Sequence, residues 1–403
     1  MTKKRLIVLG AGSSGVLAAN YFCAWLEQDW EIKLIHNPQK PILGIGESTN
    51  PSFIEALELG SNFKVHEDLK QLDGTIKLGT KYVGWRAESF VNPLLGGSMA
   101  AHIDTYSLKE FSLPRLEARW EGKFKVVEQE VLGAQSLEDC ASVTLGNGEV
   151  EYCSYIIDCR GAPSKHDPEV VHLDATLDSC IVYQDTDSSN DPGMVTYTGH
   201  TATEHGWMFT VPLQSRNSYG YMYNSTISSF DEALQGLRST VPKACAENVI
   251  EFHFSPYYAR RVLKGRILRN GNSALFFEPM FANSLWAYDN INKNFHSFLL
   301  GDINEEEVNL RHLSNAVSIR SAIALHYIGG STMYNNHPFW DLAAADSKRA
   351  LGTLEGVEFT KRVVSAVEGS KALKGFQGVK HPGVFNTIAW VNILNNLGYN
   401  TKV

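Results

Sequence analysis

The chain has 403 residues, 43% of them hydrophobic, and a formal net charge of −8. That hydrophobic fraction supports a substantial core and excludes global disorder, and the negative charge argues against nucleic acid as the main partner. No apolar run approaches the roughly 18 residues of a membrane span, and the six cysteines form no CxxC pair. We therefore expect reduced thiols, no membrane segment and a cytoplasmic protein of one large domain or two of ordinary size.

The first thirty-five residues predict a strand, a glycine-rich loop, a helix and a second strand. An apolar strand precedes "GAGSSG" at 10–15, and another strand is expected over 31–37. In this context Gly10 permits a tight turn, Gly12 lets a pyrophosphate approach the backbone, and Gly15 lets the helix pack close to the strand. The helix N-terminus would then face the phosphates, so the segment predicts dinucleotide binding.

The position that ordinarily holds the adenosine ribose lacks an acidic residue. An Asp or Glu usually ends the second strand, whereas here the position is His36 or Asn37. Either side chain can hydrogen-bond a hydroxyl group, but without the added strength of a charged acceptor. We therefore expect a loosely held cofactor.

A second glycine-rich turn, "GIGEST" at 44–49, follows soon after the first unit. A second glycine-rich turn at this place is unusual for a nicotinamide dehydrogenase. It would supply backbone N–H groups and small side chains against a flat ring. The same turn also fits an ordinary surface loop in which Ser48 or Thr49 caps the helix expected over 50–60. The two interpretations are compatible.

The segment "TIKLGTKYVGWR", 75–86, reads as a strand that carries two lysines. Strict alternation sends Lys77, Gly79 and Lys81 to the same face. One interpretation is an edge strand whose solvated lysines discourage pairing with other chains. The other is a functional amine, and the rest of the chain decides between them.

Two later segments carry signals of FAD binding. "YCSYIIDCRGAP", 152–163, is an apolar strand that ends in Asp158, and "NGNSALFFEPM", 270–280, is the other segment. Three separated segments that converge on one nucleotide fit FAD better than NAD. Before both of these segments, Asn147 and Gly148 in "LGNG", 145–148, mark a hairpin turn rather than a second nucleotide loop.

In order along the chain, these segments resemble those of the flavin-dependent halogenases of the tryptophan-halogenase type. "GAGSSGVLAA" resembles their nucleotide loop, "GIGESTNPSF" their second flavin loop, "IKLGTKYVGWR" the strand with the catalytic lysine, and "YIIDCRGAP" their "DCSG" strand. "HGWMFTVPLQSRNSYGYMYN", "NSALFFEPMFANSL" and "HYIGGSTMYNNHPFW" resemble later segments, so the resemblance covers about residues 1–345. The chain is short for the family, and compact members are carried by marine phages, so a phage-borne member is expected.

The resemblance implies an α/β protein, with a Rossmann-like FAD-binding fold of the flavin monooxygenase and halogenase type, a β-sheet wall and a helical C-terminal cap. The implied parts are a discontinuous FAD-binding domain over 1–300, its β-sheet wall at 175–230, and a helical substrate-capping segment over 301–403. FAD as FADH2, a halide ion and O2 are the implied cofactors. The implied cofactor-binding residues are Gly10, Ala11, Gly12, Ser14, Gly15, His36, Ile45, Gly46, Glu47, Ser48, Asp158 and Glu278.

The resemblance identifies Lys77, rather than Lys81, as the catalytic lysine. In the family, reduced FAD and dioxygen oxidise a bound halide to hypohalous acid, which passes through an internal tunnel to the lysine and then to an electron-rich aromatic carbon. A lysine in an apolar tunnel loses hydration, so its pKa falls and it can act as a neutral amine or as a hydrogen-bond donor. Lys81 keeps the interpretation of a solvated lysine.

Two departures from the family pattern affect the tunnel. Its expected wall is Trp207, Phe209, Pro212 and Phe281, and Phe209 stands where the family has a second Trp. The phenyl ring still fills space and excludes water, so we expect the barrier to survive. Phe281 replaces the glutamate that faces the lysine in the tryptophan enzymes, which indicates a more activated phenol- or pyrrole-type substrate rather than free tryptophan.

The expected halide site is the turn that contains Asn283 and Ser284. Backbone N–H groups in such a turn can bind an anion in a small concavity. Phe281 and Leu285 would provide an apolar wall that favours a large, weakly hydrated halide. We therefore expect bromide or iodide to be preferred over chloride.

Two other functions remain open: a flavin monooxygenase that hydroxylates an aromatic substrate, and a non-catalytic flavin-binding protein. The sequence has no second GxGxxG for NAD(P)H, so a separate flavin reductase is expected as partner, with a small aromatic molecule as substrate. No histidine pairs with a Cys or acid at metal-ligand spacing, and His200 and His205, the closest pair of histidines, are expected on a loop. We expect no metal.

Overall fold

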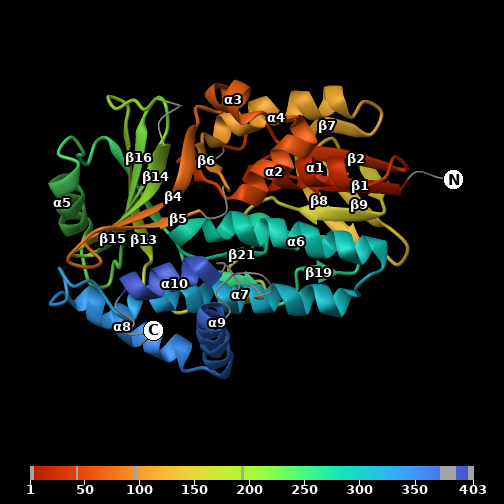
Figure 1. Cartoon of the computed structure of the whole chain (residues 1–403). Coiled ribbons are helices and arrows are strands. Elements are labelled where there is room, and N and C mark those ends of the chain that lie inside the picture. Colours follow the sequence, from red (N-terminus) through yellow and green to blue (C-terminus); the bar gives the residue numbers. More distant parts are fainter. Residues whose placement is uncertain (1–3, 42–43, 95–97, 192–194, 373–386, 398–403) are drawn as a thin grey trace.

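Two large β-sheets lie side by side, and long helices run beneath them (Figure 1). The computed structural model describes residues 4–41, 44–94, 98–191, 195–372 and 387–397. The expected α/β architecture is confirmed, with a six-stranded, mainly parallel sheet, a nine-stranded mixed sheet and helices in the C-terminal part.

The six-stranded sheet carries the predicted nucleotide fold. β1 (Lys4–Leu9), α1 (Ser13–Trp25) and β2 (Trp30–His36) follow one another as expected, and β1 pairs in parallel with β2 and with β11 (Tyr155–Asp158). The remaining strands in the order β19-β20-β11-β1-β2-β7 are β19 (Leu263–Lys264), β20 (Ile267–Arg269) and β7 (Phe124–Glu128). Because β1 and β11 are parallel neighbours, the loops that follow them meet at one edge of the sheet.

Both faces of this sheet are covered, which explains the unbroken apolar run in β1. Residues 6–9 have no exposed surface, as expected for a parallel strand buried on both sides. One face packs against helices and the other against a small antiparallel sheet. The helices are α1, α2 (Pro51–Ser61), α4 (Thr105–Arg119) and α6 (Asn283–Leu300), and the small sheet is β8 (Val131–Ser136), β9 (Ala141–Leu145) and β10 (Val150–Cys153).

The nine-stranded sheet has the order β17-β13-β16-β15-β14-β4-β6-β3, with β5 also paired to β4. Its strands are β17 (Val249–His253), β13 (Ser179–Asp185), β16 (Asn217–Tyr223), β15 (Gly206–Pro212), β14 (Val195–Thr203), β4 (Thr75–Val83), β6 (Ala100–Ile103), β3 (Glu47–Ser48) and β5 (Phe90–Pro93). β4 lies in the interior, between β14 on one side and β5 and β6 on the other. The interpretation of this segment as an edge strand is therefore wrong.

A β-bulge in β4 also overturns the expected alternation of its side chains. Lys77 pairs with Thr196 of β14 and Thr80 pairs with Thr198, so three steps along β4 match two along β14. The extra residue reverses the faces beyond it. Lys77 is consequently buried and Lys81 exposed, although strict alternation put them on the same face.

Helices dominate the described residues after 282. α7 (Glu305–Tyr327) is the helix expected over 306–328, and it packs against α6. Asn392 of the last helix donates to the Val91 carbonyl of β5 at 2.9 Å, so this helix lies on the edge of the nine-stranded sheet. The helices that follow α7 are α8 (Pro338–Leu351), α9 (Leu354–Ala372) and α10 (Thr387–Asn396).

Local expectations had mixed outcomes. The Asn147-Gly148 turn joins β9 to β10 as predicted. The cap of α2 is Asn50, whose side chain accepts from the Phe53 N–H at 2.9 Å, rather than Ser48 or Thr49. His200 lies buried within β14, not on a loop.

The smaller elements complete the connections between the sheets. Within the described ranges, each helix is too short or too polar to cross a bilayer. The smaller elements are α3 (Val65–Asp68), α5 (Phe230–Thr240), β12 (Val170–His172), β18 (Tyr257–Ala259), β21 (Leu275–Phe276) and 3-10 turns at Leu69–Leu72, Gly271–Ser273 and Met280–Ala282.

Candidate active site

A cavity of about 740 Å³ lies between the two large sheets. The loop after β1, the turn at 44–48 and the loop after β11 all line it, as do Phe209 and Val211 of β15. Its volume is within the roughly 300–1,000 Å³ of small-molecule and cofactor sites. The separated glycine-rich segments singled out from the sequence thus meet around one cavity, with the nine-stranded sheet as its wall.

The loop after β1 has the geometry that a pyrophosphate needs. Gly10 has a φ of +101°, and a Cβ there would lie 2.8 Å from the Cys159 carbonyl oxygen. A Cβ on Gly15 would lie 2.0 Å from the Gly10 oxygen, so the helix can approach the strand only with glycine. A Cβ on Gly12, the N-cap of α1, would meet nothing within 4 Å. The residues present therefore fit a dinucleotide phosphate at the N-terminus of α1.

His36 lines the same cavity at the end of β2, where the ribose acid is missing. Its Nε2 lies 3.9 Å from Glu128 Oε1. Burial, together with the positive charge of Lys109, lowers the pKa of His36 below its ordinary value. A neutral imidazole at this position can still hydrogen-bond a hydroxyl group.

Glu47 brings a carboxyl group to the N-terminus of α1. The Ser13 hydroxyl donates to Glu47 Oε1 at 2.6 Å, and both residues line the cavity. Burial raises the pKa of Glu47, and the Ser13 hydrogen bond opposes that rise. A negative charge here would repel a phosphate, so the carboxyl group lies where it can weaken nucleotide binding.

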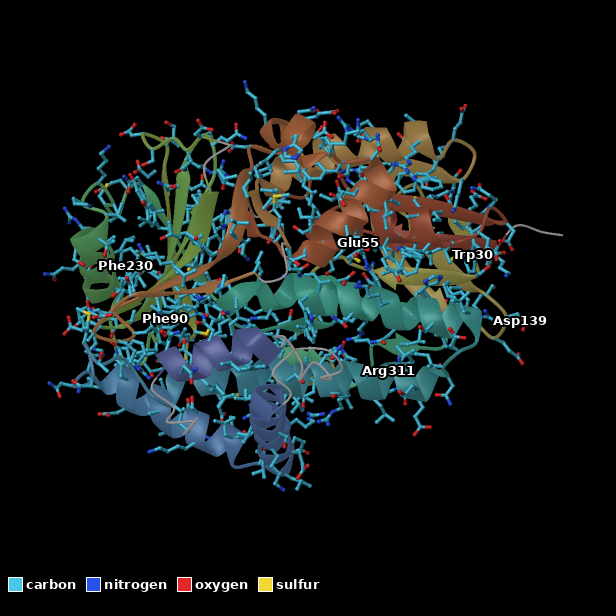
Figure 2. The ribbon with its side chains drawn as sticks, viewed as in Figure 1. Trp30, Glu55, Phe90, Asp139, Phe230 and Arg311 are labelled. Atoms are coloured by element: carbon cyan, nitrogen blue, oxygen red, sulfur yellow. The ribbon has the colours of Figure 1, made fainter. Side chains whose placement is uncertain are left out.

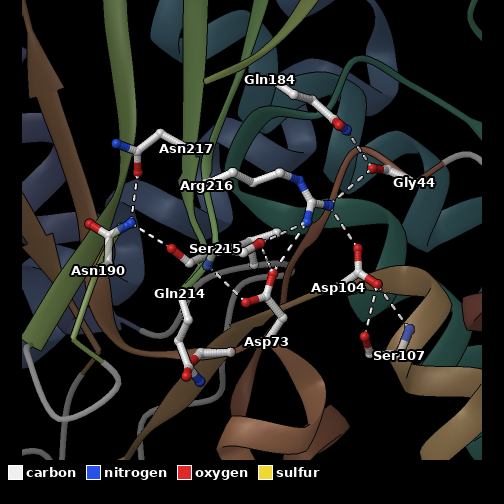
Figure 3. Close-up of polar contacts among 12 residues, drawn as sticks. Gly44, Asp73, Asp104, Ser107, Gln184, Asn190, Gln214, Ser215, Arg216 and Asn217 are labelled. Carbon is white, nitrogen blue, oxygen red and sulfur yellow. Dashed lines mark hydrogen bonds and ion pairs between the residues drawn. The ribbon is translucent and has the colours of Figure 1, made fainter. Parts of the chain in front are cut away.

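Arg216 fixes the turn at 44–48 to three other parts of the chain (Figure 3). Its guanidinium donates to Asp104 at 2.7 Å, to Asp73 at 3.2 Å and to the Gly44 carbonyl at 3.3 Å. Gln184 donates to the same carbonyl at 2.7 Å. The Arg216 side chain is 13% exposed, so these ion pairs are shielded from water and hold the turn firmly.

Lys77 is buried beside the wall of the cavity, with 3% of its surface exposed. Its Nζ donates to the Ser48 hydroxyl and to the Thr49 carbonyl, both at 2.8 Å. Burial lowers the pKa of Lys77 to about 7. Ser48 lines the cavity, so one hydroxyl group separates the amine from the space that the glycine-rich segments enclose.

The turn before α6 has an unusual backbone. Phe281 and Ala282 both have left-handed φ angles, 50° and 57°, and such strain commonly marks functional sites. The Asn283 side chain stabilises the turn by donating to the Glu278 and Met280 carbonyls at 2.8 Å. The first N–H groups of α6 have no partner within the helix, and Asn283 and Ser284 line the cavity.

Phe281, which stands in place of the family's glutamate, belongs to an aromatic stack outside the cavity wall. Its ring stacks on His326 with 5.2 Å between centroids, and the Tyr82 hydroxyl lies 3.2 Å from His326 Nε2. Tyr82 in turn stacks on Phe90, labelled in Figure 2, at 4.7 Å. Burial lowers the pKa of His326 to about 4, so this side of the site is aromatic and uncharged.

Two predicted acids lie apart from the cavity. Asp158 is paired with Arg160, whose Nη2 lies 2.7 Å from Oδ2. Glu278 accepts from the Tyr327 hydroxyl at 2.8 Å, and burial raises its pKa to about 8. Neither carboxyl group faces the space that the nucleotide loop lines.

The predicted site residues thus divide into two groups. The structure brings one group together around the cavity, and the other group lies outside the cavity lining. Gly10, Ala11, Gly12, Ser14, His36, Ile45, Gly46, Glu47, Ser48, Phe209, Asn283 and Ser284 line the cavity. Gly15, Lys77, Asp158, Trp207, Pro212, Glu278 and Phe281 do not line it.

Three residues that no sequence motif marks contribute to the site. Arg216 holds the second glycine-rich turn, Thr198 lines the cavity, and His102 contacts Thr198 at 2.9 Å. Each is brought into place by pairing between strands distant in sequence. In the part of the chain that the structure covers, the His, Cys, Asp and Glu side chains form no group of three that could hold a metal.

Comparisons with known proteins agree with this architecture. The profile of the tryptophan halogenase family matches residues 5–136 and 98–402. Tryptophan 7-halogenase RebH of Lentzea aerocolonigenes is 22% identical over 363 residues, which cover 70% of this chain and 67% of RebH.

Solved structures show the same fold at low identity. Tryptophan 6-halogenase SttH of Streptomyces toxytricini superposes with a TM-score of 0.78, at 18% identity, over 98% of this chain and 90% of that one. A tryptophan halogenase from Shewanella frigidimarina superposes with a TM-score of 0.79, at 16% identity, over 99% and 89%.

The family profile, together with the shared fold, identifies the protein as a flavin-dependent halogenase, an oxidoreductase. The chain belongs to the tryptophan halogenase family.

Proposed function

We propose that this protein is an FADH2-dependent halogenase that delivers hypohalous acid through Lys77 to an electron-rich aromatic or heteroaromatic substrate. The observation that carries the proposal is the Lys77 amine, which is 3% exposed and hydrogen-bonded to a hydroxyl on the cavity wall. A lysine needs a functional reason to stay in such a place, because desolvation of its charge is costly.

The cavity residues would hold FAD, and the bound reduced flavin with O2 would supply the oxidation of halide to hypohalous acid. The N-terminus of α1 and the space at Gly12 would receive the phosphates. His36 would hydrogen-bond the ribose in place of the usual acid. Glu278 and Asp158 would act on the cofactor only indirectly, since both are engaged by neighbouring side chains.

The wall at β15 supports separation of flavin from substrate. Phe209 lines the cavity, whereas Trp207 behind it has no exposed surface, and their ring centroids are 6.3 Å apart. These rings, with Pro212 and Phe281, would keep water and organic substrate away from the oxidant while hypohalous acid passes to Lys77.

Halide would bind at the first turn of α6. The N-terminus of α6 at Asn283 and Ser284 would attract an anion through the helix dipole, with the Ser284 N–H as donor, because the Asn283 N–H already donates to the Met280 carbonyl. Leu285 and Phe281 make the surroundings apolar, which favours bromide or iodide over chloride. Competition between halides on one substrate tests this preference, and a clear excess of chlorinated product would contradict it.

The substrate would lie on the other side of Lys77, capped by the helical segment 301–403. The aromatic stack of Phe281, His326 and Tyr82 stands where a carboxylate would otherwise assist the lysine. Without that carboxylate the arene itself must be more reactive, so phenols, pyrroles and substituted indoles are the proposed substrate class.

The test is an incubation with a flavin reductase, FAD, NADH and each halide across a panel of phenols and indoles, with mass spectrometry of the products. Halogenated product that disappears in Lys77→Ala, while oxygen is still consumed, supports the proposal. Hydroxylated product in the absence of halide would instead favour a monooxygenase, and no product with bound FAD would favour a non-catalytic flavin-binding protein.

We propose a separate flavin reductase as the partner that supplies FADH2, and the incubation therefore includes one.

The six free thiols, of which four are buried, support the expectation of a cytoplasmic location.

A further inference from the structure

A row of hydroxyl groups joins Lys77 to His102, a histidine with no exposed surface. The Ser48 hydroxyl accepts from Lys77 Nζ at 2.8 Å and lies 2.7 Å from the Thr198 hydroxyl. The Thr198 hydroxyl lies 2.9 Å from His102 Nε2. Each distance in the row is that of a direct hydrogen bond.

The far side of the imidazole fixes the direction of these hydrogen bonds. His102 Nδ1 lies 3.1 Å from Thr75 Oγ1 and 3.2 Å from Thr196 Oγ1. Both hydroxyls donate their single hydrogen to backbone carbonyls at 2.7 Å, those of Pro212 and Ile76 respectively. They can only accept from the ring, so Nδ1 carries the imidazole hydrogen.

It follows that Nε2 of His102 presents a lone pair to Thr198. The Thr198 hydroxyl donates to this nitrogen and accepts from Ser48, and the Ser48 hydroxyl accepts from Lys77. All hydrogen bonds in the row therefore run in one direction, from the amine to the imidazole. A one-way row of this kind can pass a proton by a shift of one hydrogen at each link.

The charges around the row suit such a transfer. Within the described residues, the charged group that acts on His102 is Lys77, and burial with that charge holds the pKa of His102 well below its ordinary value. His200 of β14 also experiences the charge of Lys77, and its pKa is likewise well below the ordinary value because of burial. Both imidazoles are neutral at rest, so His102 can accept a proton but returns it readily.

We propose that Ser48, Thr198 and His102 form a proton relay that converts the Lys77 ammonium into a neutral amine when hypohalous acid arrives. This role rests on the proposed function. Ser48 and Thr198 are positioning and relay residues, since they act through Lys77 rather than on the aromatic substrate.

The first half of the transfer deprotonates Lys77 and forms the N–halogen bond. One Lys77 N–H hydrogen moves to Ser48, the Ser48 hydrogen moves to Thr198, and the Thr198 hydrogen moves to Nε2, which leaves a neutral amine and an imidazolium. The amine lone pair then attacks the halogen of hypohalous acid, so an N–halogen bond forms as the O–halogen bond breaks. The oxygen leaves as water with one amine hydrogen.

In the second half, the arene carbon attacks the halogen and the N–halogen bond breaks. The imidazolium returns its proton through Thr198 and Ser48 to the lysine nitrogen, and His102 becomes neutral again. The amine then takes the hydrogen from the halogenated ring carbon and becomes an ammonium. The sum is arene plus hypohalous acid giving aryl halide plus water, with Lys77 and His102 restored.

Thr198→Val removes the central hydroxyl and keeps its volume. We expect the halogenated product formed per oxygen consumed to fall roughly 100-fold at pH 5.5, where most of the Lys77 amine is protonated, because 100-fold is the usual scale for a lost acid–base group. The variant should approach the wild-type ratio above about pH 8, where the amine is already neutral without a relay. Equal ratios for variant and wild type at pH 5.5 would overturn the relay.

Thr80→Val is the matched control, because Thr80 is buried on the strand of Lys77 and its hydroxyl makes no hydrogen bond within the residues that the structure describes. It should halogenate as the wild type does. A similar loss in both variants would attribute the effect to packing and contradict the relay.

A measurement without any variant separates the relay from the proposed function. The ¹⁵N spectrum of the histidine-labelled protein, with His102 assigned by its absence in His102→Gln, should show a neutral ring protonated on Nδ1. A ring protonated on Nε2 would overturn the relay even in an active halogenase. If the incubation gives no halogenated product, the proposed function fails, and the relay as a step of halogen transfer fails with it, whereas the Nδ1 tautomer would still confirm the row of hydrogen bonds.

Discussion

The two halves of strand β4 carry the same residue type in opposite surroundings. Lys77 lies in a polar, buried environment where its amine donates to the Ser48 hydroxyl, whereas Lys81, four residues later, is exposed. A one-residue bulge between them makes this difference. Backbone register, rather than local composition, therefore decides whether a lysine on this strand is a solvated charge or a buried amine.

Replacing the two lysines separately should give the largest contrast. We expect Lys77→Met to lower halogenation by at least about 100-fold, because the amine acts on the oxidant, with oxygen consumption retained. Lys81→Met should change neither rate nor stability, since surface substitutions usually stay within about 0.5 kcal/mol. Product analysis and denaturant unfolding of both variants check this, and a large loss in Lys81→Met would break the comparison.

Lys77→Met should also stabilise the protein. The folded-state pKa of about 7 lies below the unfolded value, so the unfolded chain binds more protons between these values and wild-type stability rises with pH there. Below about pH 7 the wild-type protein carries the full free-energy penalty of burying a charged amine, and the variant is free of it. The variant also loses the Lys77 hydrogen bonds, but at about 1 kcal/mol each these offset only part of its gain.

The resulting advantage of Lys77→Met, a few kcal/mol at pH 7, should shrink by roughly 3 kcal/mol by pH 9.5. Urea midpoints of wild type and variant at both pH values measure this change. An advantage that stayed constant with pH would mean that the lysine is not desolvated in the folded protein.

The bulge itself can be tested at Gly79. A Cβ on Gly79 would lie 2.4 Å from the Asn92 carbonyl oxygen and 2.8 Å from Pro93 Cα, so β5 must move. We expect Gly79→Ala to lower the free energy of unfolding by about 1–3 kcal/mol. Halogenation should fall roughly tenfold, because the change displaces Lys77 and catalysis is sensitive to small misplacements.

Gly133→Ala on β8 is the matched control for that variant, because a Cβ there meets nothing within 4 Å. Its thermal unfolding temperature and its halogenation rate should both be close to those of the wild type. Equal behaviour of the two glycine variants would show that the bulge has no part in placing the amine.

A smaller effect is expected at the second glycine-rich turn. Arg216→Met removes the ion pairs with Asp73 and Asp104 that hold the turn, so FAD should bind roughly tenfold more weakly, the scale of a lost buried ion pair of 1–2 kcal/mol. Arg311→Met serves as control, because its pair with Glu307 is about half exposed. Flavin fluorescence titration of both variants gives the affinities.

The smallest effect should appear at Glu47. Glu47→Gln keeps a hydrogen-bond acceptor for Ser13 but removes the negative charge near the phosphate position, so FAD should bind a few-fold more tightly at pH 7 and above. The difference should vanish as pH falls and the wild-type carboxyl group, whose pKa is raised, takes up a proton. Weaker FAD binding by the variant would assign Glu47 a direct role in holding the cofactor.

The nucleotide loop was predictable because its geometry is local. Gly10, Gly12 and Gly15 are fixed by the strand and helix on either side, and the expected turn and parallel strands are present. The resemblance to the family also identified Lys77, whose burial the structure then shows.

The surroundings of Lys77 were not predictable, because distant strands supply them. Thr198 and His102 reach the amine only through the pairing of β14 and β6 with β4, and neither lies in a motif. The bulge has no sequence signature beyond Gly79, so strict alternation gave the wrong face for Lys81. Glu278 likewise matched a motif, but it does not line the cavity, and its hydrogen-bond partner Tyr327 comes from the distant helix α7.

The central claim is that Lys77 is a desolvated amine, and its side-chain titration tests that claim most directly. NMR of protein labelled with ¹³C at the lysine Cε, with the Lys77 signal assigned by its absence in Lys77→Met, follows each lysine through pH 5–11. We expect the Lys77 signal to titrate near pH 7, far below the ordinary lysine value of about 10.4. A Lys77 signal that titrates near pH 10 together with those of solvated lysines would contradict it.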